Sequence, residues 1–161
     1  MTVRRTKGKA GGVEGLAERM AEVHRLGSTM EVGIFGRRRH TRGGKPKLAD
    51  LLAWHEFGTR TIPARRPVRS YMAGKGPGEI AKRSAVVLPP ALRGEASVED
   101  AIVAIGLVAV AGVRQGIRDR LPPPLKLPVR PGRDPALIPL FDTGQLSRAI
   151  AVRIGGKVRR T

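Results

Sequence analysis

Apolar side chains recur every three or four positions between residues 13 and 26, which predicts an amphipathic helix. Its apolar face consists of Val13, Leu16, Met20 and Val23. The glutamates of this stretch face away from these side chains and stand mostly early in the helix, as the helix dipole favours. Gly27 is the predicted end of the helix.

Two further stretches have helical spacing. In the first, residues 47–57, one face consists of Leu48, Leu51, Leu52 and His55. Gly58 fits the C-cap of this helix, where it permits a left-handed turn, and Phe57 is expected to fill the core. The second stretch covers residues 80–88, and we expect the prolines that follow to end that helix.

The most apolar part of the chain follows Ser97, whose hydroxyl is expected to cap a helix with Asp100 as its third residue. Residues 101–113 are apolar nearly all round, so other protein must wrap this helix on most sides. We expect neighbouring subunits to contribute, because a lone chain of this size could hardly cover the helix completely. The apolar run is too short to cross a bilayer.

Alternating patterns predict two strands. Residues 29–35 place Met30, Val32 and Ile34 on one side, and residues 151–158 alternate apolar side chains with Arg153 and Lys157. Helices and strands do not alternate regularly, which favours an α+β domain. We therefore expect a small, mostly antiparallel sheet packed against the long apolar helix.

Prolines, glycines and charges divide the chain further. Residues 1–12 read as a flexible basic arm, 13–121 as the core domain with a basic loop at 36–47, and 122–141 as an extended proline-rich arm. Residues 142–161 are expected to complete the core with a turn and a strand, and the turn opens on the capping signature around Asp142. The proline arm is a second expected interface.

The 161 residues carry a formal net charge of +18, which a compact domain tolerates best beside a polyanion or compensating subunits. Nucleic acid fits first, because each neutralised phosphate releases counterions, and an anionic membrane surface fits second. Arginine use by a GC-rich genome is the third explanation, which the clustering of the charges disfavours. The predicted DNA-facing residues are Arg37, Arg38, Arg39, Arg42, Lys45 and Lys47.

Catalytic and metal-binding motifs give no match. The three histidines lack metal-ligand spacing and the chain has no cysteine, so neither a thiolate site nor a disulfide is expected. Gly43-Gly44-Lys45 fails the phosphate-loop pattern, and the serines lack a nucleophile-elbow context. We therefore predict that the protein is not an enzyme and binds neither a metal nor a cofactor. The enzymatic alternative, a nuclease of the virion, would need clustered carboxylates to bind its metal.

Three segments together resemble a known family. They are Val32-Gly33-Ile34-Phe35-Gly36, the stretch Ala53-Trp54-His55-Glu56-Phe57-Gly58-Thr59 with Ile62-Pro63-Ala64-Arg65, and Asp142-Thr143-Gly144-Gln145-Leu146-Ser147. Their order resembles the virion-morphogenesis and tail-completion proteins of long-tailed bacteriophages, over roughly residues 31–154. The departure is Arg66-Pro67-Val68, where the family usually places a proline and an aromatic residue before the next arginine.

The resemblance implies an α+β structural subunit of the phage neck or head-proximal tail that forms a ring, six-fold in expectation. Its partners would be copies of itself, connector or stopper proteins, tail tube or terminator proteins, and packaged DNA held by charge, without a membrane. It would be found in the host cytoplasm during assembly and then in the virion. Subunit contacts or straps are expected from Glu56, Phe57, Gly58, Thr59, Pro63, Arg65, Arg66, Arg69, Asp142 and Leu146.

Two alternatives stay open beside this reading. The chain fits a sequence-nonspecific cellular nucleic-acid-binding protein in charge and arms, but its few aromatic residues form no evident stacking platform. The motif segment fits a solvated strap as well as a contact surface. In an extended strap, Arg65 and Arg69 project in the same direction.

Overall fold

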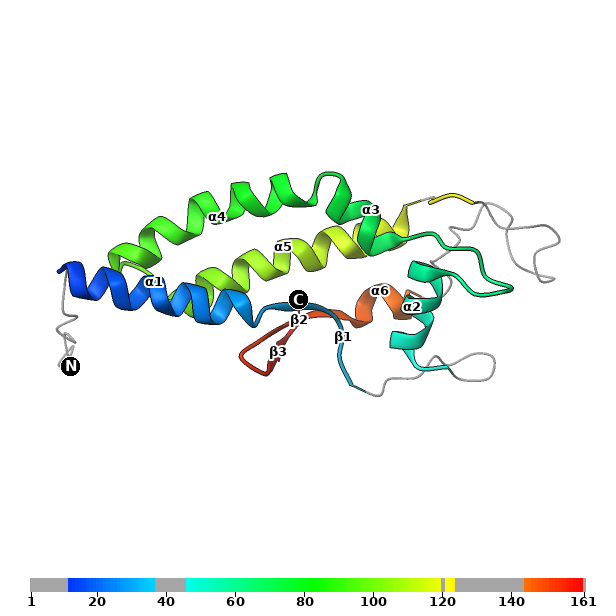
Figure 1. Ribbon diagram of the computed structural model, residues 1–161, viewed down its shortest axis with the longest axis horizontal. Helices are drawn as coiled ribbons and strands as arrows, with labels where there is room; N and C mark the ends of the chain where they lie inside the picture. The colour runs from blue at the N-terminus through cyan, green and yellow to red at the C-terminus, as the bar shows by residue number, and fades with distance from the viewer. Residues whose placement is uncertain (1–11, 37–45, 120, 124–143, 161) are drawn as a thin grey trace, which may run out of the picture.

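The computed structural model describes residues 12–36, 46–119, 121–123 and 144–160. Within these ranges it contains six helices and one three-stranded sheet (Figure 1). In chain order the elements are α1 Val13–Ser28, β1 Glu31–Ile34, α2 Leu48–Phe57, α3 Pro67–Ala73, α4 Gly76–Arg93, α5 Val98–Arg118, α6 Gln145–Ala149, β2 Ile150–Ile154 and β3 Lys157–Arg159.

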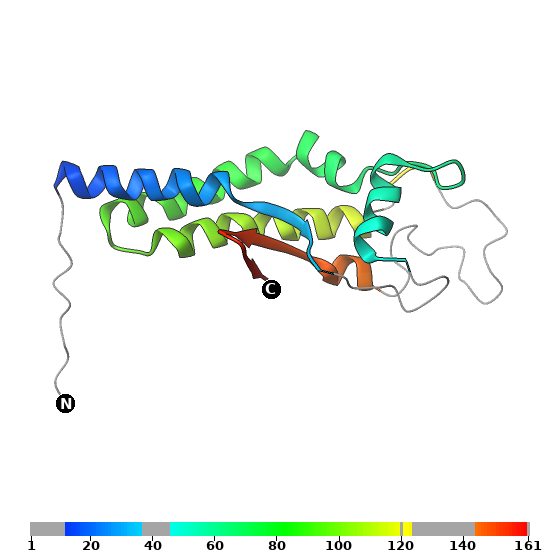
Figure 2. The same cartoon turned by 60° about the horizontal axis from the view of Figure 1, so that its bottom comes forward.

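Helix α5 is the centre of the fold, with α1, α3 and α4 packed along it and the sheet against another side (Figures 1 and 2). The predicted cap is confirmed: the Asp100 N–H donates to Ser97 Oγ at 3.3 Å. The core-facing side of the helix carries Ala101, Ile102, Ile105, Ala109, Val110, Val113 and Ile117, all buried. The chain's own elements cover this face, while the helix as a whole is not completely covered, so the expectation that neighbouring subunits contribute stays a prediction.

The prediction of an α+β fold with a small antiparallel sheet against a long apolar helix is confirmed. By length and composition alone α5 would suffice to cross a bilayer, although the apolar run within it is shorter. Just over half of its apolar window, 56%, is buried inside the protein, as in a core helix.

Two glycines in α5 mark its closest packing contacts. A Cβ at Gly106 would lie 2.6 Å from a methyl of Val152 in β2, and one at Gly112 would lie 2.0 Å from the Tyr71 ring of α3. The interruptions in the apolar pattern are therefore the places where the sheet and α3 approach the helix backbone. Tyr71 itself is buried and its hydroxyl donates to Glu79 Oε2 at 3.1 Å.

The sheet has the order β1-β2-β3, with both pairs antiparallel. In register, Val32 lies opposite Val152, and Val152 lies opposite Arg159. The single strand expected over 151–158 was wrong: Gly155 and Gly156, both at positive φ, turn the chain between β2 and β3. The central strand β2 is nearly all buried.

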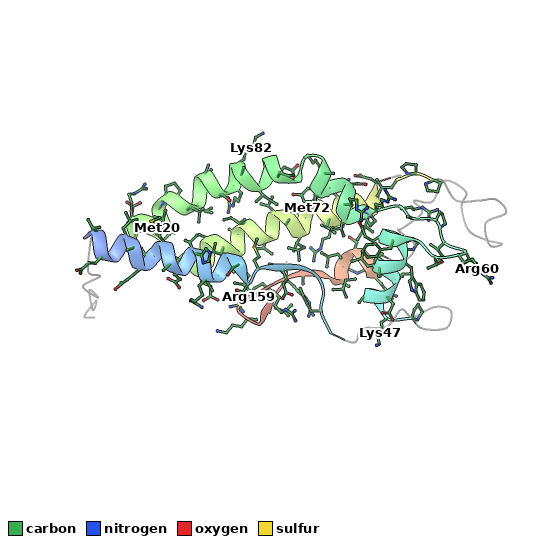
Figure 3. All side chains as sticks on the ribbon, in the orientation of Figure 1. Met20, Lys47, Arg60, Met72, Lys82 and Arg159 are labelled. Carbon is green, nitrogen blue, oxygen red and sulfur yellow. The ribbon has the colours of Figure 1, made fainter. Side chains whose placement is uncertain are left out.

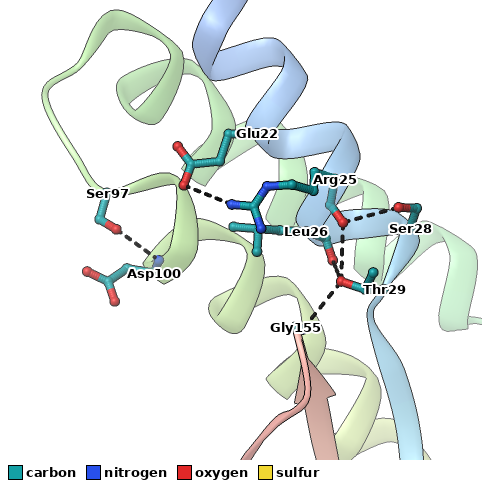
Figure 4. Close-up of polar contacts among 8 residues, drawn as sticks. All are labelled: Glu22, Arg25, Leu26, Ser28, Thr29, Ser97, Asp100 and Gly155. Atoms are coloured by element: carbon teal, nitrogen blue, oxygen red, sulfur yellow. Dashed lines mark hydrogen bonds and ion pairs between the residues drawn. The ribbon is translucent and has the colours of Figure 1, made fainter.

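The end of α1 is tied to that turn (Figure 4). Thr29 Oγ1 lies 3.2 Å from the Arg25 carbonyl and 3.1 Å from that of Leu26, and it accepts from the Gly155 N–H at 3.3 Å. The helix runs through Gly27, the expected stop, to Ser28. Thr29 thus ends α1 and fixes where β1 begins.

The predicted apolar face of α1 lies mostly outside the core. Val13, Leu16 and Met20 are 87%, 42% and 57% exposed. The side that packs on the domain carries Leu26, which is buried, and Arg19, whose Nη1 donates to the Leu92 carbonyl at 3.3 Å.

The middle of the chain is more helical than its prolines indicated. The motif segment, considered above as an extended strap, turns helical at Pro67, which occupies the first helical position of α3 and needs no N–H there. Helix α4 continues through Pro89 and Pro90, which were expected to end it. The carbonyls left without these N–H donors belong to Ala85 and Val86, both of which are exposed residues.

Candidate functional site

The segment that carries the family resemblance joins α2 to α3 and is held by hydrogen bonds within the chain. Its centre is the Glu56 carboxylate, which accepts the Val68 N–H at 3.0 Å and the Arg69 N–H at 3.1 Å. These two N–H groups belong to the first turn of α3, where no helical carbonyl reaches them. A buried glutamate of α2 thus caps α3, and we name this arrangement the α2–α3 clasp.

The chain leaves α2 through a tight turn. Gly58 has φ 81°, its N–H donates to the Trp54 carbonyl at 2.8 Å, and an added Cβ would lie 3.1 Å from the Ala64 nitrogen. Thr59 closes the following loop, because its N–H donates to the Ile62 carbonyl and its Oγ1 accepts from the Ile62 N–H at 2.9 Å. Gly58 ends α2 at positive φ, as predicted, but its ψ of 169° lies outside the left-handed helical region.

The loop returns to α2 at the His55 carbonyl, which accepts the N–H groups of Arg65 at 2.7 Å and Arg66 at 3.0 Å. Arg66 adopts the left-handed conformation, with φ 54° and ψ 51°, directly before Pro67. This kink turns the chain into α3 and sends consecutive arginines in different directions.

Arg65 is therefore buried, 6% exposed, and its Nε donates to the Pro123 carbonyl at 3.0 Å. Burial lowers the pKa of its guanidinium from the ordinary value. Arg69 is exposed and lies 3.9 Å from the Glu56 carboxylate. The expectation that Arg65 and Arg69 project in the same direction was wrong, because the extended geometry stops at Arg66.

His55 lies beside this buried arginine on the inner face of α2, as its spacing with the leucines predicted. Burial, and secondly the charge of Arg65, lower the pKa of His55 to about 4. The imidazole is therefore neutral at pH 7. Its Nδ1 is buried and has no hydrogen-bond partner within the described part of the chain.

Acid is expected to destabilise the protein through His55. Between pH 6.5 and pH 4 the unfolded chain binds a proton that the folded chain does not, so stability falls as pH falls through this window. With allowance for partial exposure, the loss is about 1–2 kcal/mol. Urea unfolding at pH 7 and pH 4.5 should show a smaller loss for His55→Gln than for the wild type. His24→Gln, at an exposed position on α1, is the control; an equal loss in all three proteins would contradict the expectation.

The outer face of α2 carries two aromatic side chains. Trp54 is 38% exposed and Phe57 is 72% exposed. The expectation that Phe57 fills the core was wrong: the leucines and His55 occupy the inner face, and Phe57 stands opposite them. A helical wheel of residues 48–57 contains this information, so the exposed pair could have been found from the sequence.

Exposed cations surround the same end of the molecule. Lys47 stands at the start of α2 and Arg60 at the tip of the loop after it (Figure 3). Arg66 and Arg69 are exposed at the start of α3. The edge of the predicted basic loop, at Lys47, and the motif, at Arg60, thus both place charge on this end.

The other predicted contact residues divide into two groups. Leu146 is buried in the core on α6 and Glu56 is buried in the clasp, so neither offers a surface to another subunit. Pro63 and Thr59 are exposed. Five of the predicted DNA-facing residues and Asp142 lie outside the described residues: Arg37, Arg38, Arg39, Arg42 and Lys45. No group of three His, Asp or Glu side chains that could hold a metal occurs in the part of the chain that the structure describes.

Comparisons with known protein families, with curated proteins and with solved structures found no match to this chain.

Proposed function

We propose that this protein is a structural subunit of a phage-like particle, placed in the neck or the head-proximal tail, where copies of it form a ring around the end of the packaged DNA. Its work is geometric and electrostatic, and involves no catalysis. The resemblance of the motif segments to tail-completion proteins supplies the particle and the location.

The observation that carries the proposal is the concentration of exposed charge at the α2 end. Lys47 and Arg60 stand at this end, Arg66 and Arg69 are exposed at the start of α3, and segment 37–45, just before Lys47 in the sequence, carries five further cations. Repeated around a symmetric lumen, such an end forms a cationic sleeve, which holds DNA by its phosphates whatever the sequence.

The clasp supports a structural role in the same way. Hydrogen bonds within the chain hold α2, α3 and Pro123 together, and they are made by Glu56, Gly58, Thr59 and Arg65. The outer surface of α2, the loop after it and the start of α3 is thereby held rigid, and it carries aromatic and basic side chains. We name this surface the platform. A rigid platform suits assembly, because little conformational entropy is lost when it is buried.

Replacing Arg37, Arg38, Arg39 and Arg42 together by glutamine is expected to leave folding and assembly intact and to reduce retention of packaged DNA. In solution, the slope of log affinity for a mixed-sequence duplex against log salt should become less steep, because fewer counterions are released. Genome content of purified particles and fluorescence anisotropy measure the two effects. If the variant particles keep their genomes and infect normally, these arginines have no essential DNA-facing role.

The oligomeric state after co-expression with neighbouring neck and tail proteins separates the proposal from its alternative. A closed ring supports the structural subunit. A monomer that binds short duplexes tightly would instead indicate a cellular nucleic-acid-binding protein, and sequence preference in that binding would exclude the sleeve.

A further inference from the structure

We draw no further inference here: the strongest candidate, the exposed aromatic pair Trp54 and Phe57 on the outer face of α2, carries no proposal because nothing in the structure shows what covers it.

Discussion

Replacing Gly112 by valine is expected to destabilise the protein by about 3 kcal/mol or more, enough to unfold a domain of ordinary stability in part. The first added carbon would lie 2.0 Å from two ring atoms of Tyr71 and 2.6 Å from its hydroxyl oxygen. The ring cannot retreat easily, because Tyr71 is buried and its hydroxyl is bonded to Glu79. Either α3 separates from α5 or the ring leaves its site.

Urea unfolding followed by circular dichroism measures this loss, with Gly112→Ala expected to show a smaller one. Gly27→Ala is the matched control, since it lies inside α1 with nothing within 4 Å of the added carbon. There the better helix propensity of alanine should stabilise the protein by up to about 1 kcal/mol. Equal effects at the two positions would show that helix propensity, and not contact with Tyr71, decides the result.

The elements that the sequence predicted well are those whose signals are local. The Ser97 cap, the apolar run after it and the alternation of β1 each depend on neighbouring residues, and each was confirmed. The inner face of α2 was predicted for the same reason, since residues three or four positions apart share one side of a helix.

The elements that were missed depend on partners far along the chain. Helix α3 begins at Pro67 because the carboxylate of Glu56, twelve positions before Val68, accepts the first N–H groups of the helix, and no pattern around Pro67 indicates that acceptor. Helix α4 passes Pro89 and Pro90, and the residues whose carbonyls lose a donor, Ala85 and Val86, are exposed, which depends on how the helix packs on α5. The exposure of Val13, Leu16 and Met20 likewise follows from which side of α1 meets the Leu92 carbonyl.

The candidate site was predicted in composition but not in arrangement. Clustered arginines were evident, yet the left-handed Arg66 decides that Arg65 turns inward to Pro123 while Arg69 stays outside. The role of Glu56 shows the same limit. The sequence predicted Glu56 as a contact or strap residue. In the structure it is buried, and its carboxylate holds the start of α3 in place.

Replacing Glu56 by alanine is expected to cost about 2–3 kcal/mol of stability, because two N–H groups of the α3 first turn lose their acceptor while still partly buried. Arg69 also loses the carboxylate that lies 3.9 Å from its Nε, a minor term at an exposed site. Glu56→Gln keeps one acceptor oxygen and should lose less. Thermal and urea unfolding measure both variants, and Glu18→Ala, an exposed glutamate of α1, is the control.

The clasp further predicts where the damage appears. Amide hydrogen exchange in Glu56→Ala should accelerate first at Val68, Arg69 and the rest of α3, while β2 stays protected because its contacts with α5 and β1 are untouched. The exposed cations of this end would then lose their fixed geometry although their charge is unchanged. A variant that unfolds uniformly, or that exchanges like the wild type at α3, would show that the carboxylate does not hold the platform. Selective loosening of α3, together with impaired assembly, would instead tie the motif segment to the rigidity that the proposed ring requires.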